Sequence, residues 1–104
     1  MNSFGLSTEH TKKIRACLAQ EPKIEKAVLY GSRAKGNYKP GSDIDLTLFA
    51  PTMNLTELLA LENKLDDLLL PYKIDLSLFH QIENPDLVDH IQRVGKVLLE
   101  MPRT

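Results

Sequence analysis

The chain has 104 residues, of which 42% are hydrophobic and 26% are charged, with a formal net charge of −1. This length and composition predict one globular domain over residues 1–104, and the lack of positive charge excludes a protein that grips long DNA or RNA through a basic surface. No apolar run approaches the roughly 20 residues of a membrane span, and a single cysteine with no secretory signal predicts a cytoplasmic location.

The first expected element is a helix that Ser7 or Thr8 caps and that ends near Pro22. The apolar spacing along it predicts a buried face made of Ile14, Cys17 and Leu18. Cys17 is interpreted as a buried apolar residue and not as a reactive thiol, because nothing near it in the sequence would depress its pKa.

A strand over about Lys26–Tyr30 comes next and stops at Gly31-Ser32. Gly31 allows a ligand to approach the backbone closely, and Ser32 offers a hydroxyl and an N–H to phosphate oxygens. We therefore expect Gly31 and Ser32 to bind a nucleotide. Tyr30 is expected to pack in the core or at an edge, with stacking on a base as the less favoured reading.

Ten residues, 33 to 42, connect this strand to the next one. Their first half is expected to form a short helical turn that points N–H groups toward an anion, and Pro40-Gly41 predicts a turn with the glycine at positive φ. Arg33 and Lys35 lie nearest Ser32 and are the expected cationic contacts to a triphosphate. The alternative is that these cations belong to a solvated loop.

The second strand, about Asp43–Phe49, begins with two carboxylates. Because alternate residues of a strand share a face, Asp43 and Asp45 point one way while Ile44, Leu46 and Leu48 enter the core. Two carboxylates about 7 Å apart repel each other, and a shared Mg²⁺ would relieve this repulsion. The first and second strands must be antiparallel if this expected Mg²⁺ site is to lie next to the Gly31–Ser32 turn.

A leucine-rich helix is expected over residues 55–70, with a capping box between Asn54 and Glu57. Its leucines indicate core burial in preference to a partner-binding face. Leu61 and Leu70 are the two that we expect outside the core face.

The third strand, Lys73–Phe79, repeats the pattern of the second strand, as neighbouring strands joined through a crossover helix would. If its apolar residues are buried, Asp75 falls on the opposite face, so three carboxylates gather on one side of the sheet. The alternative is three acidic residues that simply face water.

Asn84-Pro85-Asp86 predicts the start of a last helix, which Gly95 ends. A short strand over residues 97–99 and a loose tail from residue 102 are expected after it. The histidines show no metal-ligand spacing and are assigned surface or packing roles, with His80 the strongest exception among His10, His80 and His90.

This constellation favours nucleotidyl transfer. Asp43 and Asp45 would hold one Mg²⁺ at the triphosphate, and a second Mg²⁺ shared with Asp75 would activate an acceptor hydroxyl. Asp75 could instead act as the general base. The catalytic and metal-binding candidates are therefore Asp43, Asp45 and Asp75, and the nucleotide-binding candidates are Gly31, Ser32, Arg33 and Lys35.

Gly31-Ser32, the ten-residue spacer and Asp43-Ile44-Asp45-Leu46 resemble the signature of the DNA polymerase β-like nucleotidyltransferase superfamily. The fuller run of residues 31–46 is similar to the minimal nucleotidyltransferases (MNT proteins), which are usually paired with a helical HEPN protein. The resemblance covers nearly the whole chain. It implies an α/β (α+β) fold with a small mixed sheet and helices packed on it.

The same resemblance implies a function that the residues alone do not give. In the MNT type of toxin–antitoxin system, AMP is transferred from ATP to a tyrosine of a HEPN ribonuclease toxin, and the transferase acts as the antitoxin. Larger relatives carry an additional helical domain, so either a second copy or a separate chain completes the site or the acceptor is itself a protein, and the resemblance implies the protein acceptor. The alternatives are a non-catalytic antitoxin that occludes a helical partner and, ranked last, an aminoglycoside-type nucleotidyltransferase.

Overall fold

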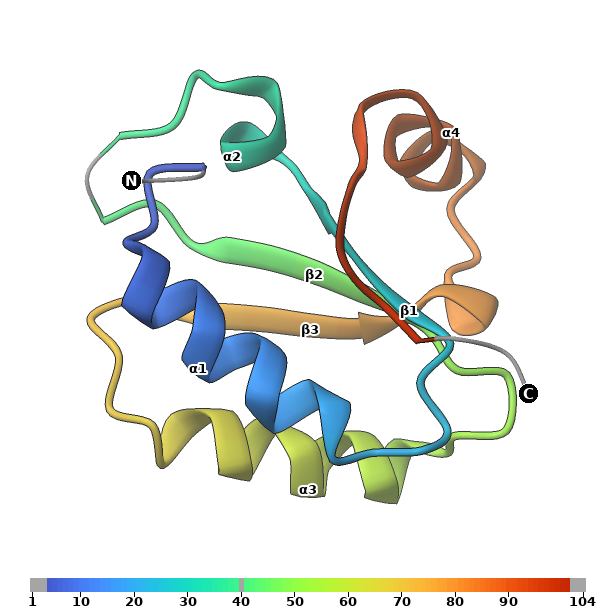
Figure 1. Cartoon of the computed structure of the whole chain (residues 1–104). Helices are drawn as coiled ribbons and strands as arrows, with labels where there is room; N and C mark the ends of the chain where they lie inside the picture. Colours follow the sequence, from blue (N-terminus) through green and yellow to red (C-terminus); the bar gives the residue numbers. More distant parts are fainter. Residues whose placement is uncertain (1–3, 40, 102–104) are drawn as a thin grey trace.

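The structure, a computed structural model, describes residues 4–39 and 41–101 (Figure 1). Helices and strands follow one another as α1 Thr8–Ala19, β1 Lys26–Tyr30, α2 Ser32–Lys35, β2 Ile44–Phe49, α3 Leu55–Asp66, β3 Ile74–Leu78, the 3₁₀ turn η1 Phe79–Gln81, α4 Pro85–Val94 and β4 Lys96–Glu100. The expected order of helices and strands is confirmed. The turn at Pro40 and the tail from Pro102 lie outside the described residues.

One four-stranded mixed sheet organises the molecule, with the strand order β3-β2-β1-β4. β1 is antiparallel to both β2 and β4, whereas β2 and β3 are parallel. A parallel pair needs a crossover connection, and α3 supplies it. The antiparallel arrangement of the first two strands, on which the predicted site depends, is confirmed.

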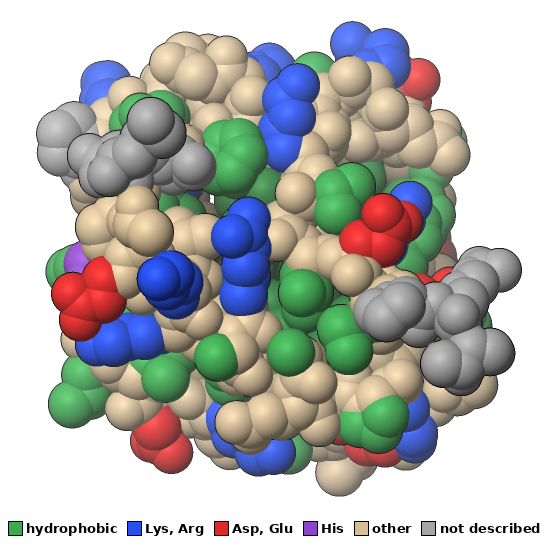
Figure 2. Space-filling view, in the orientation of Figure 1, with side chains coloured by type: hydrophobic (Ala, Val, Ile, Leu, Met, Phe, Trp, Pro, Cys, Tyr) green, Lys and Arg blue, Asp and Glu red, His purple; other side chains and the backbone are tan. Residues whose placement is uncertain are grey.

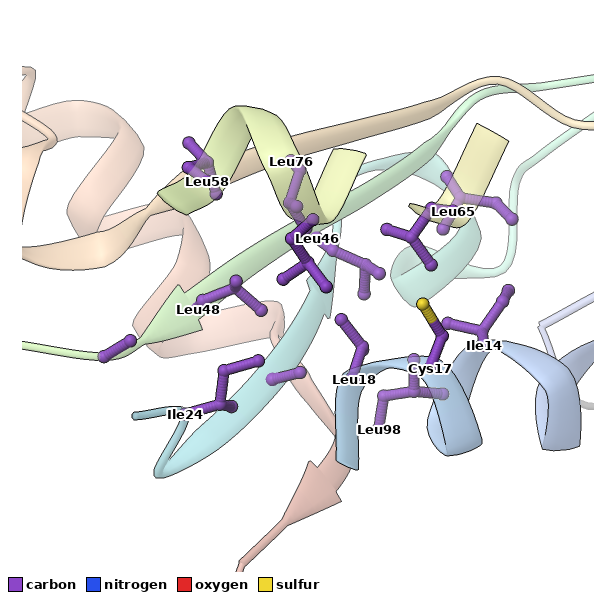
Figure 3. Close-up of a cluster of buried hydrophobic side chains, with 14 of the residues drawn as sticks. Ile14, Cys17, Leu18, Ile24, Leu46, Leu48, Leu58, Leu65, Leu76 and Leu98 are labelled. Atoms are coloured by element: carbon purple, nitrogen blue, oxygen red, sulfur yellow. The ribbon is translucent and has the colours of Figure 1, made fainter. Parts of the chain in front are cut away.

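The main core lies between the sheet and the helices α1 and α3. Alternate residues of the central strands are fully buried there, among them Leu46 and Leu48, and they meet Ile14 and Leu18 of α1 (Figure 3). Each fully buried leucine contributes about 1.5–3 kcal/mol to folding. Cys17 belongs to this cluster with 8% of its surface exposed, as expected for a structural thiol.

Helix α4 covers the opposite face of the sheet. Its Ile91 is 3% exposed and does not belong to the main core cluster. A Cβ at Gly95, the residue that ends α4, would lie only 2.6 Å from Cγ1 of Val28 on β1. The backbone after α4 therefore packs directly against β1, on the same side as the predicted carboxylates.

Helix α3 is shorter than the sequence pattern predicts. It begins with the expected capping box between Asn54 and Glu57 but ends at Asp66, because Leu69 adopts a left-handed conformation with φ of 55°. Leu70 precedes Pro71, a position that disfavours helix. The expectation for Leu61 was wrong, since it is 4% exposed; Leu70 is partly buried against the core.

The surface carries no dominant charge of one sign on the face shown in Figure 2, where basic, acidic and hydrophobic side chains are interspersed. This mixture agrees with the net charge of −1. Within residues 4–39 and 41–101, none of the helices has both the length and the hydrophobicity of a transmembrane span.

Candidate active site

The turn at Gly31 and Ser32 begins where β1 ends. Gly31 has φ of 76° and ψ of −155°, a backbone conformation that is essentially restricted to glycine. A Cβ at this position would also overlap Oδ2 of Asp45. The Asp45 carboxylate therefore lies directly against the Gly31 backbone, which joins the predicted phosphate-binding turn to the predicted metal ligands.

Helix α2 follows this turn, as the sequence predicts. It is a single turn in which the Lys35 N–H donates to the Gly31 carbonyl oxygen at 3.1 Å, and Gly36 ends it in the left-handed conformation. The N–H groups of a first turn have no acceptor within their own helix. Ser32 is half-buried at the start of this turn, and Lys35 is exposed.

Asp45 and Asp75 lie side by side on adjacent strands. The parallel register of β2 and β3 sets them directly opposite each other, and adjacent strands lie about 4.8 Å apart. Their neighbours Ile44 and Leu76 are buried on the other face. The predicted alternation is thus confirmed for this pair, while Asp43 lies one residue before β2 and is exposed.

Burial and like charge together perturb Asp45. Its pKa is raised, first by burial of the carboxyl group and then by the negative charges of Asp75 and Asp43, whereas His90 opposes the shift. The charges of Asp75 and Asp43 therefore repel the charge of Asp45. A proton or a cation near Asp45 would relieve this repulsion.

The carboxylates do not form a ready-made metal cage. Across the described ranges, no group of three or more His, Cys, Asp or Glu side chains is arranged to hold a metal ion. What fits Mg²⁺ is the chemistry of the donor set, since carboxylate oxygens are hard ligands and here they already repel each other. The metal-binding role of Asp43, Asp45 and Asp75 stays a prediction.

The Arg33 side chain is buried inside the fold, although its place in the sequence suggests a position facing the nucleotide. Its side chain is 2% exposed, and its guanidinium donates to the carbonyl oxygens of Ser42 (3.1 and 2.8 Å) and Phe4 (2.8 Å). The rings of Tyr38 and Tyr72 lie 5.2 and 5.0 Å from it. We therefore withdraw Arg33 as a triphosphate contact, because its donors are used inside the fold.

Tyr30 packs against its neighbours. Its ring meets the ring of His90 edge to face at a centroid distance of 6.2 Å. Burial raises its pKa, a hydrogen bond with Ser77 lowers it, and the charges of Asp45 and Asp75 raise it further. The expected packing role is confirmed.

Sequence reasoning missed one residue of the site. The Nε2 atom of His90 accepts a hydrogen bond from the Gly31 N–H at 3.1 Å. His90 is 59 positions away along the chain, and its packing role was assigned because it lacks metal-ligand spacing. The one available signal was its position beside Ile91 on the apolar face of the last helix, which is also consistent with simple burial.

The sequence matches known nucleotidyltransferases. A family model described as polymerase beta, nucleotidyltransferase, matches residues 12–104. A Methanocaldococcus jannaschii protein that is named as a putative protein adenylyltransferase is 35% identical over 86 residues, which cover 82% of this chain and 87% of that protein. A second protein of that organism, named in the same way, is 33% identical over 86 residues with the same coverage.

Solved structures share the fold. A chain of the crystal structure of a toxin–antitoxin with AMP-PNP superposes with a TM-score of 0.72 at 27% identity, covering 88% of this chain and 73% of that chain. The tri-AMPylated Shewanella oneidensis HEPN toxin in complex with its MNT antitoxin gives a TM-score of 0.67 at 24% identity, covering 89% of this chain and 71% of that chain. At the latter identity the likeness shows the fold alone.

Proposed function

The chain belongs to the polymerase β nucleotidyltransferase family, and on that premise we propose that it moves AMP from ATP to a hydroxyl group of a protein. The proposed acceptor is a tyrosine of a HEPN ribonuclease toxin, so that the chain acts as an antitoxin. The observation that carries the proposal is the position of the Asp45 carboxylate, against Gly31 and beside Asp75.

The relatives support the choice of a protein acceptor. Those with the higher sequence identity are named as protein adenylyltransferases. Among the structures of the same fold, one is a toxin–antitoxin with AMP-PNP, and in another the HEPN toxin carries AMP groups in its complex with the MNT antitoxin. A HEPN partner and a nucleoside triphosphate are accordingly the partner and substrate that we propose.

The Gly31–Ser32 turn would bind the triphosphate. The Ser32 hydroxyl and N–H can donate to phosphate oxygens, and Gly31 brings no side chain of its own into the turn. Lys35 is exposed one turn further on, so its ammonium group is free to approach the same phosphates. Lys35 therefore remains a proposed contact, unlike Arg33.

Asp43, Asp45 and Asp75 would hold Mg²⁺, with two ions in the expected arrangement. When bound, the ions would neutralise charge on the triphosphate and on the entering and leaving oxygens. The raised pKa of Asp45 supports this assignment, because carboxylates that repel each other favour a bound cation. Asp75 is exposed next to Asp45 and can also accept the proton of the acceptor hydroxyl.

The proposal is tested by incubating the purified chain with a HEPN partner, Mg²⁺ and ATP labelled at the α-phosphate. We expect label and mass to increase on the partner in whole AMP units and its ribonuclease activity to fall. Asp45→Ala and Asp75→Ala should abolish labelling. Asp66→Ala is the matched control, because Asp66 is an exposed acidic residue on α3, outside the candidate site.

The outcomes separate the alternatives. If Asp45→Ala still inhibits the ribonuclease fully without any labelling of the partner, the chain acts by occlusion and the catalytic proposal fails. Labelling of a small aminoglycoside-type acceptor in place of the protein would instead indicate a small-molecule nucleotidyltransferase.

A further inference from the structure

His90 reaches the candidate nucleotide site from a different part of the chain. It lies on α4, is half-buried, and accepts the Gly31 N–H through Nε2 at 3.1 Å. Through this hydrogen bond, helix α4 contacts the Gly31–Ser32 turn.

The Gly31 peptide needs to be held, because glycine has the widest choice of backbone conformations. Contacts with the surroundings select φ of 76° and ψ of −155° from the many conformations open to a glycine. Its carbonyl oxygen is fixed by the Lys35 N–H at 3.1 Å. Its N–H is fixed by His90, so the two hydrogen bonds together determine the orientation of this residue.

The helix and the ring that carry the acceptor are packed against the sheet and against Tyr30. Ile91, the next residue of α4, is 3% exposed against the sheet, and Gly95 ends the helix with its N–H donating to the Ile91 carbonyl oxygen at 2.9 Å. The imidazole ring also meets the Tyr30 ring edge to face, with an interplanar angle of 80°. The Nε2 atom therefore reaches Gly31 from a ring that contacts Tyr30, on a helix that Ile91 anchors to the sheet.

We propose that His90 is a positioning residue of the nucleotide site, whose Nε2 holds the Gly31–Ser32 turn in the shape that receives the triphosphate. The identity of the ligand rests on the proposed function, whereas the hold on the turn does not. An Nε2 atom that accepts a hydrogen bond carries no proton, so the ring proton of neutral His90 lies on Nδ1. The positioning role therefore requires the Nδ1–H tautomer of His90.

The role is tested first on the unmodified chain by ¹⁵N NMR of the histidine rings near neutral pH. We expect His90 to show the Nδ1–H tautomer. A His90 ring protonated on Nε2 cannot accept the Gly31 N–H and would overturn the proposal. This measurement decides the matter even where a variant fails to fold.

Variants then separate positioning from packing. His90→Phe keeps an aromatic ring beside Tyr30 but removes the acceptor, whereas His90→Gln retains an acceptor near the position of Nε2. We expect His90→Phe to shift the Gly31 amide resonance and to weaken binding of AMP-PNP with Mg²⁺ about threefold to tenfold, as the loss of one hydrogen bond would. His90→Gln should restore much of both, and His80→Phe, at an exposed histidine, is the matched control.

The two proposals fail in different ways. If the unmodified chain binds neither AMP-PNP nor ATP in the presence of Mg²⁺, the proposed function fails. The Gly31 amide resonance and the His90 tautomer can still be measured in that case, and they test the positioning role separately. If nucleotide binds normally while His90→Phe leaves the Gly31 resonance and the affinity unchanged, the positioning role is overturned.

Discussion

Gly31 and Asp45 share one small space, and each restricts what the other position can hold. Gly31 has a positive φ, and a side chain there would overlap the Asp45 carboxylate. Asp45 in turn is half-buried beside another carboxylate. Burying the Asp45 carboxylate beside another carboxylate does not favour folding, which is a common sign that a site is maintained for its chemistry.

Gly31→Ala should destabilise the chain by about 3 kcal/mol, since it adds both backbone strain and a steric overlap. Gly36→Ala is the matched control, because Gly36 also has a positive φ but the space that a Cβ would occupy there is open to 4 Å. It should cost only about 1 kcal/mol, the cost of strain alone. Urea denaturation measures the free energy of unfolding of both variants. Equal losses of stability in Gly31→Ala and Gly36→Ala would contradict a clash with Asp45.

Removing the charge of Asp45 should stabilise the chain at neutral pH. The raised pKa means that the folded state binds this proton more readily than the unfolded state does, so stability falls as pH rises above about 3.9, the usual aspartate pKa. Asp45→Asn should therefore melt at a higher temperature than the parent at pH 7, and the difference should vanish in strong acid.

Thermal melts across pH, with and without Mg²⁺, make this measurement. Mg²⁺ should reduce the difference in melting temperature between Asp45→Asn and the parent chain at pH 7, because it should stabilise the parent alone. Asp66→Asn controls for the loss of a surface charge in general. A parent that is more stable than Asp45→Asn at pH 7 without metal would show that repulsion does not govern this group.

At the scale of elements, the alternation of each strand was readable in advance and the end of α3 was not. The buried residues of β2 and β3 predicted the face on which Asp45 and Asp75 lie, because strand alternation is local. The end of α3 depends on Leu69, whose left-handed conformation no apolar spacing reveals. The leucine pattern continued past Asp66 and so predicted a longer helix.

Leu69→Gly should stabilise the chain by about 1 kcal/mol. The leucine has φ of 55° and is 87% exposed, so glycine relieves backbone strain with little loss of buried surface. Leu59→Gly is the opposite control, since Leu59 lies inside α3 with 49% of its surface exposed and the change should cost about 1 kcal/mol. Chemical denaturation of both variants shows whether each change raises or lowers the free energy of unfolding. A loss of stability in Leu69→Gly would show that the Leu69 backbone is not strained.

At the scale of the whole molecule, contacts between distant segments decided what the sequence could not. Arg33 was predicted to face the nucleotide because it lies next to Ser32, but its guanidinium is buried against the N-terminal segment and the end of the connector. His90 was overlooked because its partner is 59 positions away. Both residues depend on tertiary packing, which motif spacing does not encode.

Arg33→Met should destabilise the chain by about 2–4 kcal/mol, because carbonyl groups of Phe4 and Ser42 lose a charged donor inside the fold. Lys35→Met, at an exposed position of the same short helix, should change stability by less than about 0.5 kcal/mol. Denaturation midpoints of the two variants provide the comparison. Equal midpoints would mean that Arg33 is not a structural residue and would make it a candidate nucleotide contact again.

The parallel pairing of β2 with β3 also limits where the length of this chain can change. Losing one residue inside β3 would turn a carboxylate into the core and a leucine out to water. Losing one between α3 and β3, in residues 67–73, leaves the alternation of both strands intact. Natural insertions and deletions among relatives should therefore collect in that connection and spare the strands on either side of it.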